Sequence, residues 1–156
     1  MLQQIQFNQN RANNQNQVMP MRNRISFGEL QRTLLGLKPD AYEKGLAGQI
    51  KNEILAETGL KVVMQKIKVQ SREMMGNHYA HHSGKAFFEG LIDYVTRGKF
   101  GAYVLEGDDA VVKLRDTALN LREKYGVVGQ RENLIHSSDS AEAAENEIGK
   151  FFSKEA

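Results

Sequence analysis

Eleven of the first 17 residues are glutamine or asparagine, and this segment limits where a folded domain is able to begin. Such side chains bury too little apolar surface to offset the entropy lost when a chain becomes ordered. We therefore expect residues 1–28 to form a disordered Gln/Asn-rich tail and residues 29–156 to form one folded domain. A domain of that size buries enough surface to hold a core without disulfide or metal staples.

The charges divide unevenly between these two parts. The tail carries three arginines and no acidic residue, whereas the other 128 residues hold 18 basic and 19 acidic side chains. The pI of about 8.8 therefore describes the tail rather than a nucleic-acid-binding face. The chain has no cysteine, which excludes disulfides, thiolate metal sites and a cysteine nucleophile.

Membrane and targeting signals are weak in this chain. No apolar run approaches the ~20 residues that a membrane span needs, and no secretory segment follows Met1. We expect a cytoplasmic protein that has no contact with membranes. A transit peptide or a basic nucleic-acid-binding arm is the alternative for the tail, but three arginines without an amphipathic stripe favour neither.

Strand-like and helix-like segments alternate along the domain. Short apolar or alternating runs predict strands over 32–37, 60–69, 100–106 and 133–136. Periods of three to four residues predict helices over 41–58, 71–82, 87–96 and 108–121, and a last helix after the serine cluster that ends at Ser140. This order predicts an α+β fold with a ferredoxin-like βαββαβ core, in which helices surround a four-stranded antiparallel sheet.

Two of these segments carry more specific expectations. Gly45 and Gly48 weaken the first turns of the helix over 41–58 and favour its division in two, and Gly59 closes it. The alternation in 60–69 predicts one apolar face, formed by Val62, Met64, Ile67 and Val69. In the last helix we expect Ala141, Ala144, Ile148 and Phe151 to pack inward.

Three histidines lie within five residues of one another. The chain has no Walker phosphate loop, no dinucleotide-binding glycine motif and no H-E-x-x-H metal motif. His78, His81 and His82 have the spacing of helical zinc ligands. The alternative is a helix end where histidines cap carbonyls or meet solvent, and the absence of an accompanying carboxylate pattern favours this alternative.

Lysine 38 stands where a predicted strand meets the start of a helix, in Lys38-Pro39-Asp40. Considered alone, the pattern favours a surface lysine before an N-capping aspartate. A lysine at this place is also able to pair with a phosphate group in a cleft.

A second junction of strand and helix holds the fourth histidine, His136, in the segment Asn133–Ser140. The N–H groups and dipole of the following helix favour an anion beside the imidazole, and a neutral imidazole is a competent phosphoryl acceptor. Glu147 lies two turns into that helix and is able to orient the ring. The alternative is ordinary N-capping by Ser138, Asp139 or Ser140 with a bystander histidine.

Several separate segments now resemble one family in the same order. Asn133–Ser140 resembles the N-x-x-H-G-S-D-S signature of the nucleoside diphosphate kinases. The similarity covers about residues 30–152. After the signature it continues in Ala144–Ile148 and Phe151-Phe152, and before it in Lys38-Pro39-Asp40 with Gly45-Leu46, in His78-Tyr79 with Lys85–Leu91, and in Glu106-Gly107 with Val111–Lys113. The resemblance implies a ping-pong kinase, in which His136 takes the γ-phosphoryl group of a nucleoside triphosphate, usually ATP, and passes it to a nucleoside diphosphate.

The resemblance also assigns roles to individual residues. It implies that His136, Glu147 and Lys38 are catalytic, with Glu147 orienting the histidine. The implied nucleotide-binding residues are Lys38, Tyr79, Phe87, Leu91, Arg115, Arg122, Asn133 and Ser138. Phe87 and Leu91 would hold the base by its flat face, and Mg²⁺ would be carried by the nucleotide phosphates, with no protein metal ligands.

The chain departs from the family pattern in a few places. Only six residues separate Arg115 from Arg122, where the family has a long loop, and Thr117 is a poor match for the threonine of that loop. The loop and the C-terminal arm that this chain lacks usually build a hexamer, so we expect a smaller or different homo-oligomer. Ser137 replaces a glycine beside the nucleophile, and Lys85-Ala86 replaces Arg-Pro.

Two other functions stay open from the sequence. One is a non-catalytic nucleotide-binding or regulatory relative, which the presence of every implied ionic and nucleophilic group does not favour. The other is a single-stranded nucleic-acid-binding module that uses the basic tail and the sheet. The near-neutral domain lacks the aromatic and basic strand signature of such sheets, so nucleic acid is not an expected partner.

Overall fold

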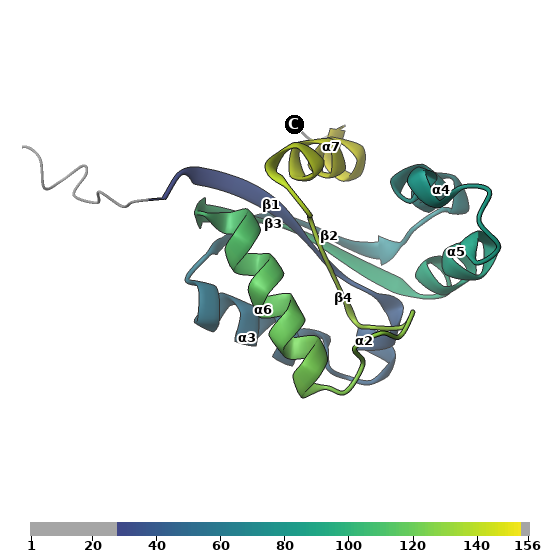
Figure 1. The fold of residues 1–156 in the computed structure, drawn as a ribbon, viewed down its shortest axis with the longest axis horizontal. Coiled ribbons are helices and arrows are strands. Elements are labelled where there is room, and N and C mark those ends of the chain that lie inside the picture. Colours follow the sequence, from purple (N-terminus) through teal and green to yellow (C-terminus); the bar gives the residue numbers. More distant parts are fainter. Residues whose placement is uncertain (1–27, 154–156) are drawn as a thin grey trace, which may run out of the picture.

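The computed structural model describes residues 28–153, so the expected tail lies outside the described residues except for Gly28. Figure 1 shows a sheet covered by helices on both faces. In chain order the elements are β1 (Leu30–Leu37), α2 (Pro39–Glu43), α3 (Ala47–Thr58), β2 (Lys61–Val69), α4 (Arg72–His78), the 3₁₀ helix η1 (Ala80–His82), α5 (Phe88–Thr96), β3 (Lys99–Asp108), α6 (Ala110–Lys124), β4 (Ile135–Ser137) and α7 (Ala141–Phe152).

The sheet has the strand order β2-β3-β1-β4, and every neighbouring pair is antiparallel. Helices α3 and α6, which connect β1 to β2 and β3 to β4, pack on one face, whereas α4, α5 and α7 pack on the other (Figure 1). This is the ferredoxin-like arrangement that the alternation of segments predicts, and the α+β fold class is confirmed. None of the helices in residues 28–153 is both long and apolar enough to cross a membrane.

The central strand β1 ties the two halves of the core together. Leu35 and Leu37 pack in the cluster with α3 and α6, and Leu34 packs in the cluster with α4, α5 and α7. All three leucines are completely buried because β1 has a strand on each side and helices on both faces. Burying each of them contributes roughly 1.5–3 kcal/mol to folding.

The expected helix over 41–58 is divided into α2 and α3, as the glycines favour. Lys38 occupies the N-cap position and Pro39 the first turn, where a missing N–H costs nothing. Gly45 between the helices and Gly59 after them have φ values of 69° and 70°, a left-handed conformation that suits glycine.

The apolar face expected for residues 60–69 is only partly correct. A β-bulge between Val62 and Met64 changes which side chains face inward, because it adds a residue to one side of the alternation. Val62 and Met64 pack against the core clusters, but Ile67 and Val69 are 42% and 57% exposed. Strand β2 lies at the edge of the sheet, and the described residues contain no helix that covers these two side chains.

The last strand and helix differ from their predicted limits. The predicted strand over 133–136 runs over Ile135–Ser137 instead, because Leu134 has a φ of 74° and leaves extended geometry. Helix α7 begins after Ser140, whose side chain caps the N–H of Ala143. Ala141 is exposed rather than packed, and Phe152 is buried in its place beside Phe151.

Candidate active site

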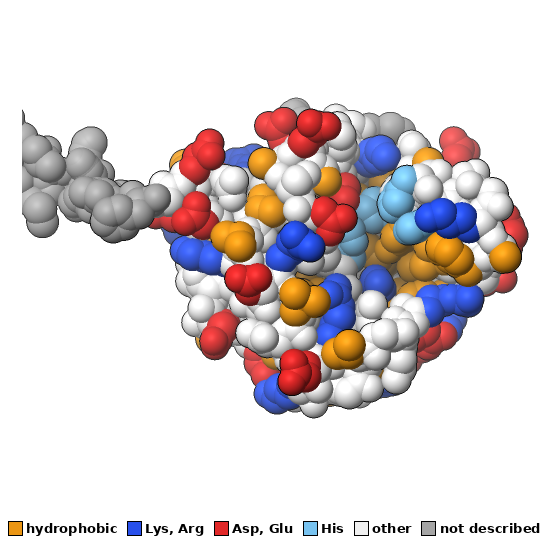
Figure 2. Space-filling model, viewed as in Figure 1, with side chains coloured by type: hydrophobic (Ala, Val, Ile, Leu, Met, Phe, Trp, Pro, Cys, Tyr) orange, Lys and Arg blue, Asp and Glu red, His pale blue; other side chains and the backbone are white. Residues whose placement is uncertain are grey.

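A cavity of about 260 Å³ opens between α6 and the α4–η1 segment, beside the residues of β4. Figure 2 shows histidine side chains gathered at this hollow, with lysine and arginine side chains around it. We call it the His136 cavity. It is lined by six of the residues to which the resemblance assigns a role: Lys38, Tyr79, Arg115, Arg122, His136 and Glu147.

His136 is held at the cavity by its bond to Glu147. Nε2 of His136 lies 2.8 Å from Oε1 of Glu147, and the hydroxyl of Ser138 donates to the same oxygen over 2.7 Å. Burial raises the pKa of Glu147, but the bonds from His136 and Ser138 outweigh burial and hold the pKa below its usual value. An ionised carboxylate only accepts hydrogen bonds, so Nε2 carries the proton and Nδ1 keeps its lone pair.

A glycine on the neighbouring strand makes room for this histidine. Gly36 of β1 pairs with His136 of β4 across the sheet. A Cβ atom at position 36 would lie 2.6 Å from the ring of Phe100 and 3.0 Å from the Cβ of His136. Position 36 therefore requires glycine, because any side chain would push His136 or Phe100 away.

Lys38 is buried, with 8% of its surface exposed, so the prediction of a surface lysine is wrong. Its ammonium donates to Oδ1 of Asn133 over 2.8 Å and lies 5.9 Å from the centre of the Tyr94 ring. Burial and the nearby Arg122 lower the pKa of Lys38 from 10.5 to about 8, although Asp40 acts in the opposite direction. A buried cation of this kind gains most when an anion enters the cavity.

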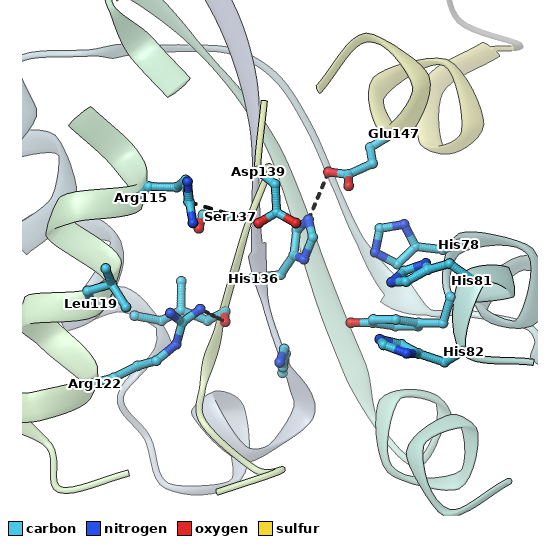
Figure 3. A pocket seen from close by; sticks show the side chains of 13 residues that line it. His78, His81, His82, Arg115, Leu119, Arg122, His136, Ser137, Asp139 and Glu147 are labelled. Atoms are coloured by element: carbon cyan, nitrogen blue, oxygen red, sulfur yellow. Dashed lines mark hydrogen bonds and ion pairs between the residues drawn. The ribbon is translucent and has the colours of Figure 1, made fainter. Parts of the chain in front are cut away.

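Two arginines approach from one side of α6. Arg122 is partly buried, and its Nη2 donates to the carbonyl of Ile135 over 2.6 Å. Arg115 is half exposed and stands 3.9 Å from Asp139. Because the two arginines are seven residues apart, two helical turns bring them to the same face (Figure 3).

The three clustered histidines form the opposite wall of the cavity (Figure 3). The described residues contain no group of three His, Cys, Asp or Glu side chains placed to hold a metal ion, so the zinc interpretation gains no support. The helix-end interpretation is correct in part, because His78 ends α4 and His81 is exposed, but His78 is buried, 4.9 Å from His136 between ring centres. Burial, with His136 second, lowers the pKa of His78 to about 3, so its ring stays neutral.

Several buried polar atoms beside the cavity have no hydrogen-bond partner in the structure. They are both ring nitrogens of His78, the hydroxyl of Tyr79 and Nε of Arg122. Burial raises the pKa of Tyr79, so its hydroxyl stays protonated and able to donate. Buried polar groups are nearly always satisfied, and a set of unpaired ones at one cavity indicates a polar ligand.

Four of the predicted binding residues lie outside the cavity lining. Asn133 bonds to Lys38, and Ser138 is fully buried, accepting from the N–H of Leu34 and donating to Glu147. Leu91 is buried in the core against α4 and α7. Phe87 is 41% exposed, with its ring 5.1 Å from that of His82.

Helix α6 continues through the place where the sequence lacks a long loop. Arg115 and Arg122 therefore lie on one unbroken helix, with Leu119 between them at the cavity. Thr117 is buried and lines a different groove, between α3 and α6, which agrees with its poor match to a binding threonine. The sequence analysis missed Leu119, which lines the cavity without a motif of its own; Ile135 and Asp139 also line it, and both lie in the segment Asn133–Ser140.

The fold and the cavity together define a class of protein: a ferredoxin-like domain that presents a histidine among cations, an arrangement suited to a phosphotransferase. The family model described as nucleoside diphosphate kinase matches residues 31–156. A nucleoside diphosphate kinase from Desulforamulus reducens is 42% identical over 137 residues, covering 81% of this chain and 90% of that one. A nucleoside diphosphate kinase from Archaeoglobus fulgidus is 40% identical over 135 residues, covering 80% of this chain and 87% of that one.

Solved structures agree with the sequence relatives. The Aquifex aeolicus nucleoside diphosphate kinase superposes with a TM-score of 0.71 at 32% identity, covering 80% of this chain and 96% of that one. A halophilic nucleoside diphosphate kinase from Halobacterium salinarum, solved in complex with CDP, gives 0.70 at 35% identity, covering 80% and 88%. This chain belongs to the nucleoside diphosphate kinase family, and the predicted enzyme class, a phosphotransferase acting on nucleotides, is confirmed.

Proposed function

We propose that this chain performs its phosphoryl transfer through a phosphohistidine at Nδ1 of His136. The observation that carries the proposal is the bond from Nε2 to Glu147, which leaves Nδ1 as the nitrogen with a lone pair. Lys38, Arg115 and Arg122 border the same cavity and supply the positive charge that a triphosphate needs. Phosphoryl transfer asks mainly for positioning and charge stabilisation, and these residues provide both.

Two half-reactions follow from this arrangement. In the first, the lone pair of Nδ1 attacks the γ-phosphorus, the bond to the β–γ bridging oxygen breaks, and the diphosphate leaves with those electrons. In the second, a β-phosphate oxygen of another nucleoside diphosphate attacks the phosphorus, and the P–N bond breaks with its electrons returning to Nδ1. The carboxylate of Glu147 stabilises the positive charge that develops on the ring in between.

Nucleotide binding is divided among groups on both walls. We assign the phosphates to the side chains of Lys38, Tyr79, Arg115 and Arg122, and the base to the exposed face of Phe87. The CDP bound to the Halobacterium salinarum relative supports a nucleoside diphosphate as ligand. Asn133, Ser138 and Leu91 act indirectly here: Asn133 through Lys38, Ser138 through Glu147, and Leu91 by packing α5 onto the core.

The metal in this proposal is Mg²⁺, held by the nucleotide phosphates and water. The cavity fits such an ion, because Glu147 is engaged with His136 and Asp139 is exposed beside Arg115, so no carboxylate cage competes for it. Mg²⁺ commonly binds in this way, through substrate phosphates, and neutralises charge that develops there. A homo-oligomer and a cytoplasmic location stay predictions from the sequence; the exposed edge of β2 supports an assembly of some kind.

Incubation with γ-labelled ATP and Mg²⁺ tests the phosphohistidine. We expect stoichiometric labelling that is stable in alkali and labile in acid, and release of the label as a new triphosphate when unlabelled CDP or GDP is added. Transfer without a labelled enzyme would indicate direct transfer between nucleotides. No labelling and no transfer would favour a non-catalytic, nucleotide-binding relative.

Removal of the metal is expected to stop the reaction without changing the protein. In EDTA, the initial rate of phosphoryl transfer should fall at least about 100-fold, since the phosphate charge is no longer neutralised. Re-addition of Mg²⁺ should restore it fully. The melting temperature without nucleotide should not change in EDTA; a drop would show a structural metal, for which His78, His81 and His82 would be the first candidates.

A further inference from the structure

A strained turn precedes the strand that carries His136. Leu134 has a φ of 74°, and the N–H of Ile135 donates to the carbonyl of Asn133 over 2.8 Å. A positive φ with a hydrogen bond between residues i and i+2 defines the γ-turn of the rare, strained kind. Leucine disfavours this backbone conformation, so the surrounding structure must hold it in place.

The turn presents three hydrogen-bond acceptors to the two cations Lys38 and Arg122, which line the cavity. The side chain of Asn133 accepts from the ammonium of Lys38 over 2.8 Å, and the carbonyl of Leu134 accepts from the backbone N–H of Lys38 over 2.9 Å. The carbonyl of Ile135 accepts from Nη2 of Arg122 over 2.6 Å. The next residue is His136, so two cations and the nucleophile all take their position from this one turn.

The buried carboxylate of Asp40 stabilises the turn by a hydrogen bond to its backbone. Asp40, which is 1% exposed, accepts the N–H of Leu134 at Oδ2 over 3.1 Å and the hydroxyl of Tyr94 at Oδ1 over 2.6 Å. The centre of the Tyr94 ring lies 5.9 Å from the ammonium of Lys38 and 5.2 Å from the guanidinium of Arg97. Tyr94 therefore fixes the carboxylate through its hydroxyl and Lys38 through its ring.

A second connection on the surface supports the same segment. Arg97, at the end of α5, forks to Glu43 of α2 and to Glu132, the residue before Asn133. The buried pair Tyr94 and Asp40 connects α5 to α2 and to the segment before β4, and the surface ion pairs of Arg97 make the same connection. Of the two, only the buried pair reaches the strained N–H of Leu134.

We infer that Asp40 and Tyr94 are positioning residues of the phosphoryl transfer, which lock the γ-turn at Leu134 and so align Lys38 and Arg122 with His136. The inference rests on the proposed function, since it assigns these residues to the phosphohistidine site. Neither residue lines the His136 cavity, so both act through the turn rather than on the nucleotide. Without the lock, the backbone at Leu134 is free to relax to a negative φ, which turns the carbonyls that Lys38 and Arg122 use.

Tyr94→Phe is the mildest test, because it removes one hydroxyl and keeps the ring. The rate constant for phosphohistidine formation, measured in a single turnover at saturating ATP and Mg²⁺, should fall about tenfold or more, since small displacements of reacting groups are costly. The final amplitude of labelling should stay at one per chain. Tyr42→Phe is the matched control: its hydroxyl lies 3.4 Å from that of Tyr103, outside the cavity lining, and the rate should not change.

Two changes at Asp40 separate positioning from loss of stability. Asp40→Asn keeps an acceptor for the N–H of Leu134 and a group that bonds the Tyr94 hydroxyl, so the rate near pH 7 should stay within a few-fold of wild type. Asp40→Ala removes both bonds and should slow the rate at least as much as Tyr94→Phe. Loss of folded protein would instead lower the amplitude and leave the rate constant unchanged.

The result for each variant either supports or overturns the inference. A wild-type rate constant in both Tyr94→Phe and Asp40→Ala, or a reduced amplitude at a normal rate, overturns the inference. If Asp40→Ala does not fold, Tyr94→Phe decides, because its change is confined to one oxygen atom. Failure of wild type to form the phosphohistidine would overturn the proposed function instead, and it is seen before any variant is compared.

Discussion

His136→Ala is expected to leave a folded protein that has lost phosphoryl transfer by roughly 10⁵-fold or more, the scale on which removal of a nucleophile acts. The remaining groups bind and orient the phosphates. Among the described residues, no other imidazole that lines the cavity combines a ring nitrogen that has a lone pair with a hydrogen bond from the other ring nitrogen to a carboxylate. His78 lies 4.9 Å away between ring centres and has no bond to Glu147 that would stabilise a phosphorylated ring. The measurement is transfer from ATP to GDP, together with labelling by γ-labelled ATP.

The fold of this variant should be retained. Glu147 keeps the hydroxyl of Ser138 as a donor, and the Ser138 oxygen keeps the N–H of Leu34. His82→Ala provides the comparison, because it removes another imidazole from the cavity wall and should still give labelled protein, at a reduced rate. Acid-labile label on His136→Ala would contradict the assignment of the nucleophile.

Lys38→Met is expected to stabilise the protein while reducing its activity by about 100-fold to 1000-fold, the range for loss of one positioned cation. Burial, followed by Arg122, lowers the pKa of Lys38 to about 8, so at neutral pH the free protein bears the cost of a buried charge. Removing the charge eliminates that cost, which is about 3 kcal/mol, but losing the hydrogen bond to Asn133 destabilises the variant by about 1 kcal/mol. We therefore expect the free energy of unfolding to rise by about 2 kcal/mol at pH 7.

The pH dependence of stability identifies the cause. The unfolded chain holds the proton of Lys38 up to its ordinary pKa of 10.5, whereas the folded chain releases it near 8. Between these values the unfolded state binds more protons, so wild-type stability should gain a contribution that grows from pH 8 to pH 10.5 and is absent below pH 8. Lys38→Met should lack this contribution.

A matched lysine controls for the loss of charge alone. Lys68 on the edge strand β2 is exposed, so Lys68→Met should change neither activity nor the dependence of stability on pH. The measurements are denaturant unfolding between pH 7 and pH 10.5 and steady-state transfer at pH 7. A less stable Lys38→Met, with the same pH dependence as wild type, would contradict the buried charge.

These opposite effects describe how the site works. A cation that is costly in the empty cavity becomes favourable when phosphates replace the water it has lost. Arg122 is in a similar position, because burial lowers the pKa of its guanidinium and its Nε has no partner. The free enzyme thus stores an electrostatic strain that nucleotide binding relieves.

Much of the fold was accessible from residue patterns. Ser71 and Ser140 cap helices α4 and α7 as the local sequence predicts, and Gly59 ends α3. Local rules of this kind succeed because a cap or a glycine acts on its own few residues. They fail on β2, where the bulge and the position at the edge of the sheet decide that Ile67 and Val69 face solvent.

Part of the candidate site has a local signal in the sequence, and part of it does not. The spacing of His136 and Glu147, eleven residues apart across a helix cap, is a local signal, and the two side chains do bond. Leu119 gives no such signal, because it reaches the cavity only through the packing of α6. The histidines of α4 and η1 were noticed for their spacing, but their role as a wall comes from the contact with β4.

The sequence by itself determined the order of strands and helices and the helix caps, and it supplied the proposed nucleophile and cations. These depend on which residues occur and on how neighbours along the chain interact. Only the tertiary structure decided that Lys38 is buried against Asn133, 95 residues away, and that Asp40 holds the turn at Leu134, 94 residues away. Burial and strain are properties of contacts between distant segments, and no local pattern records them.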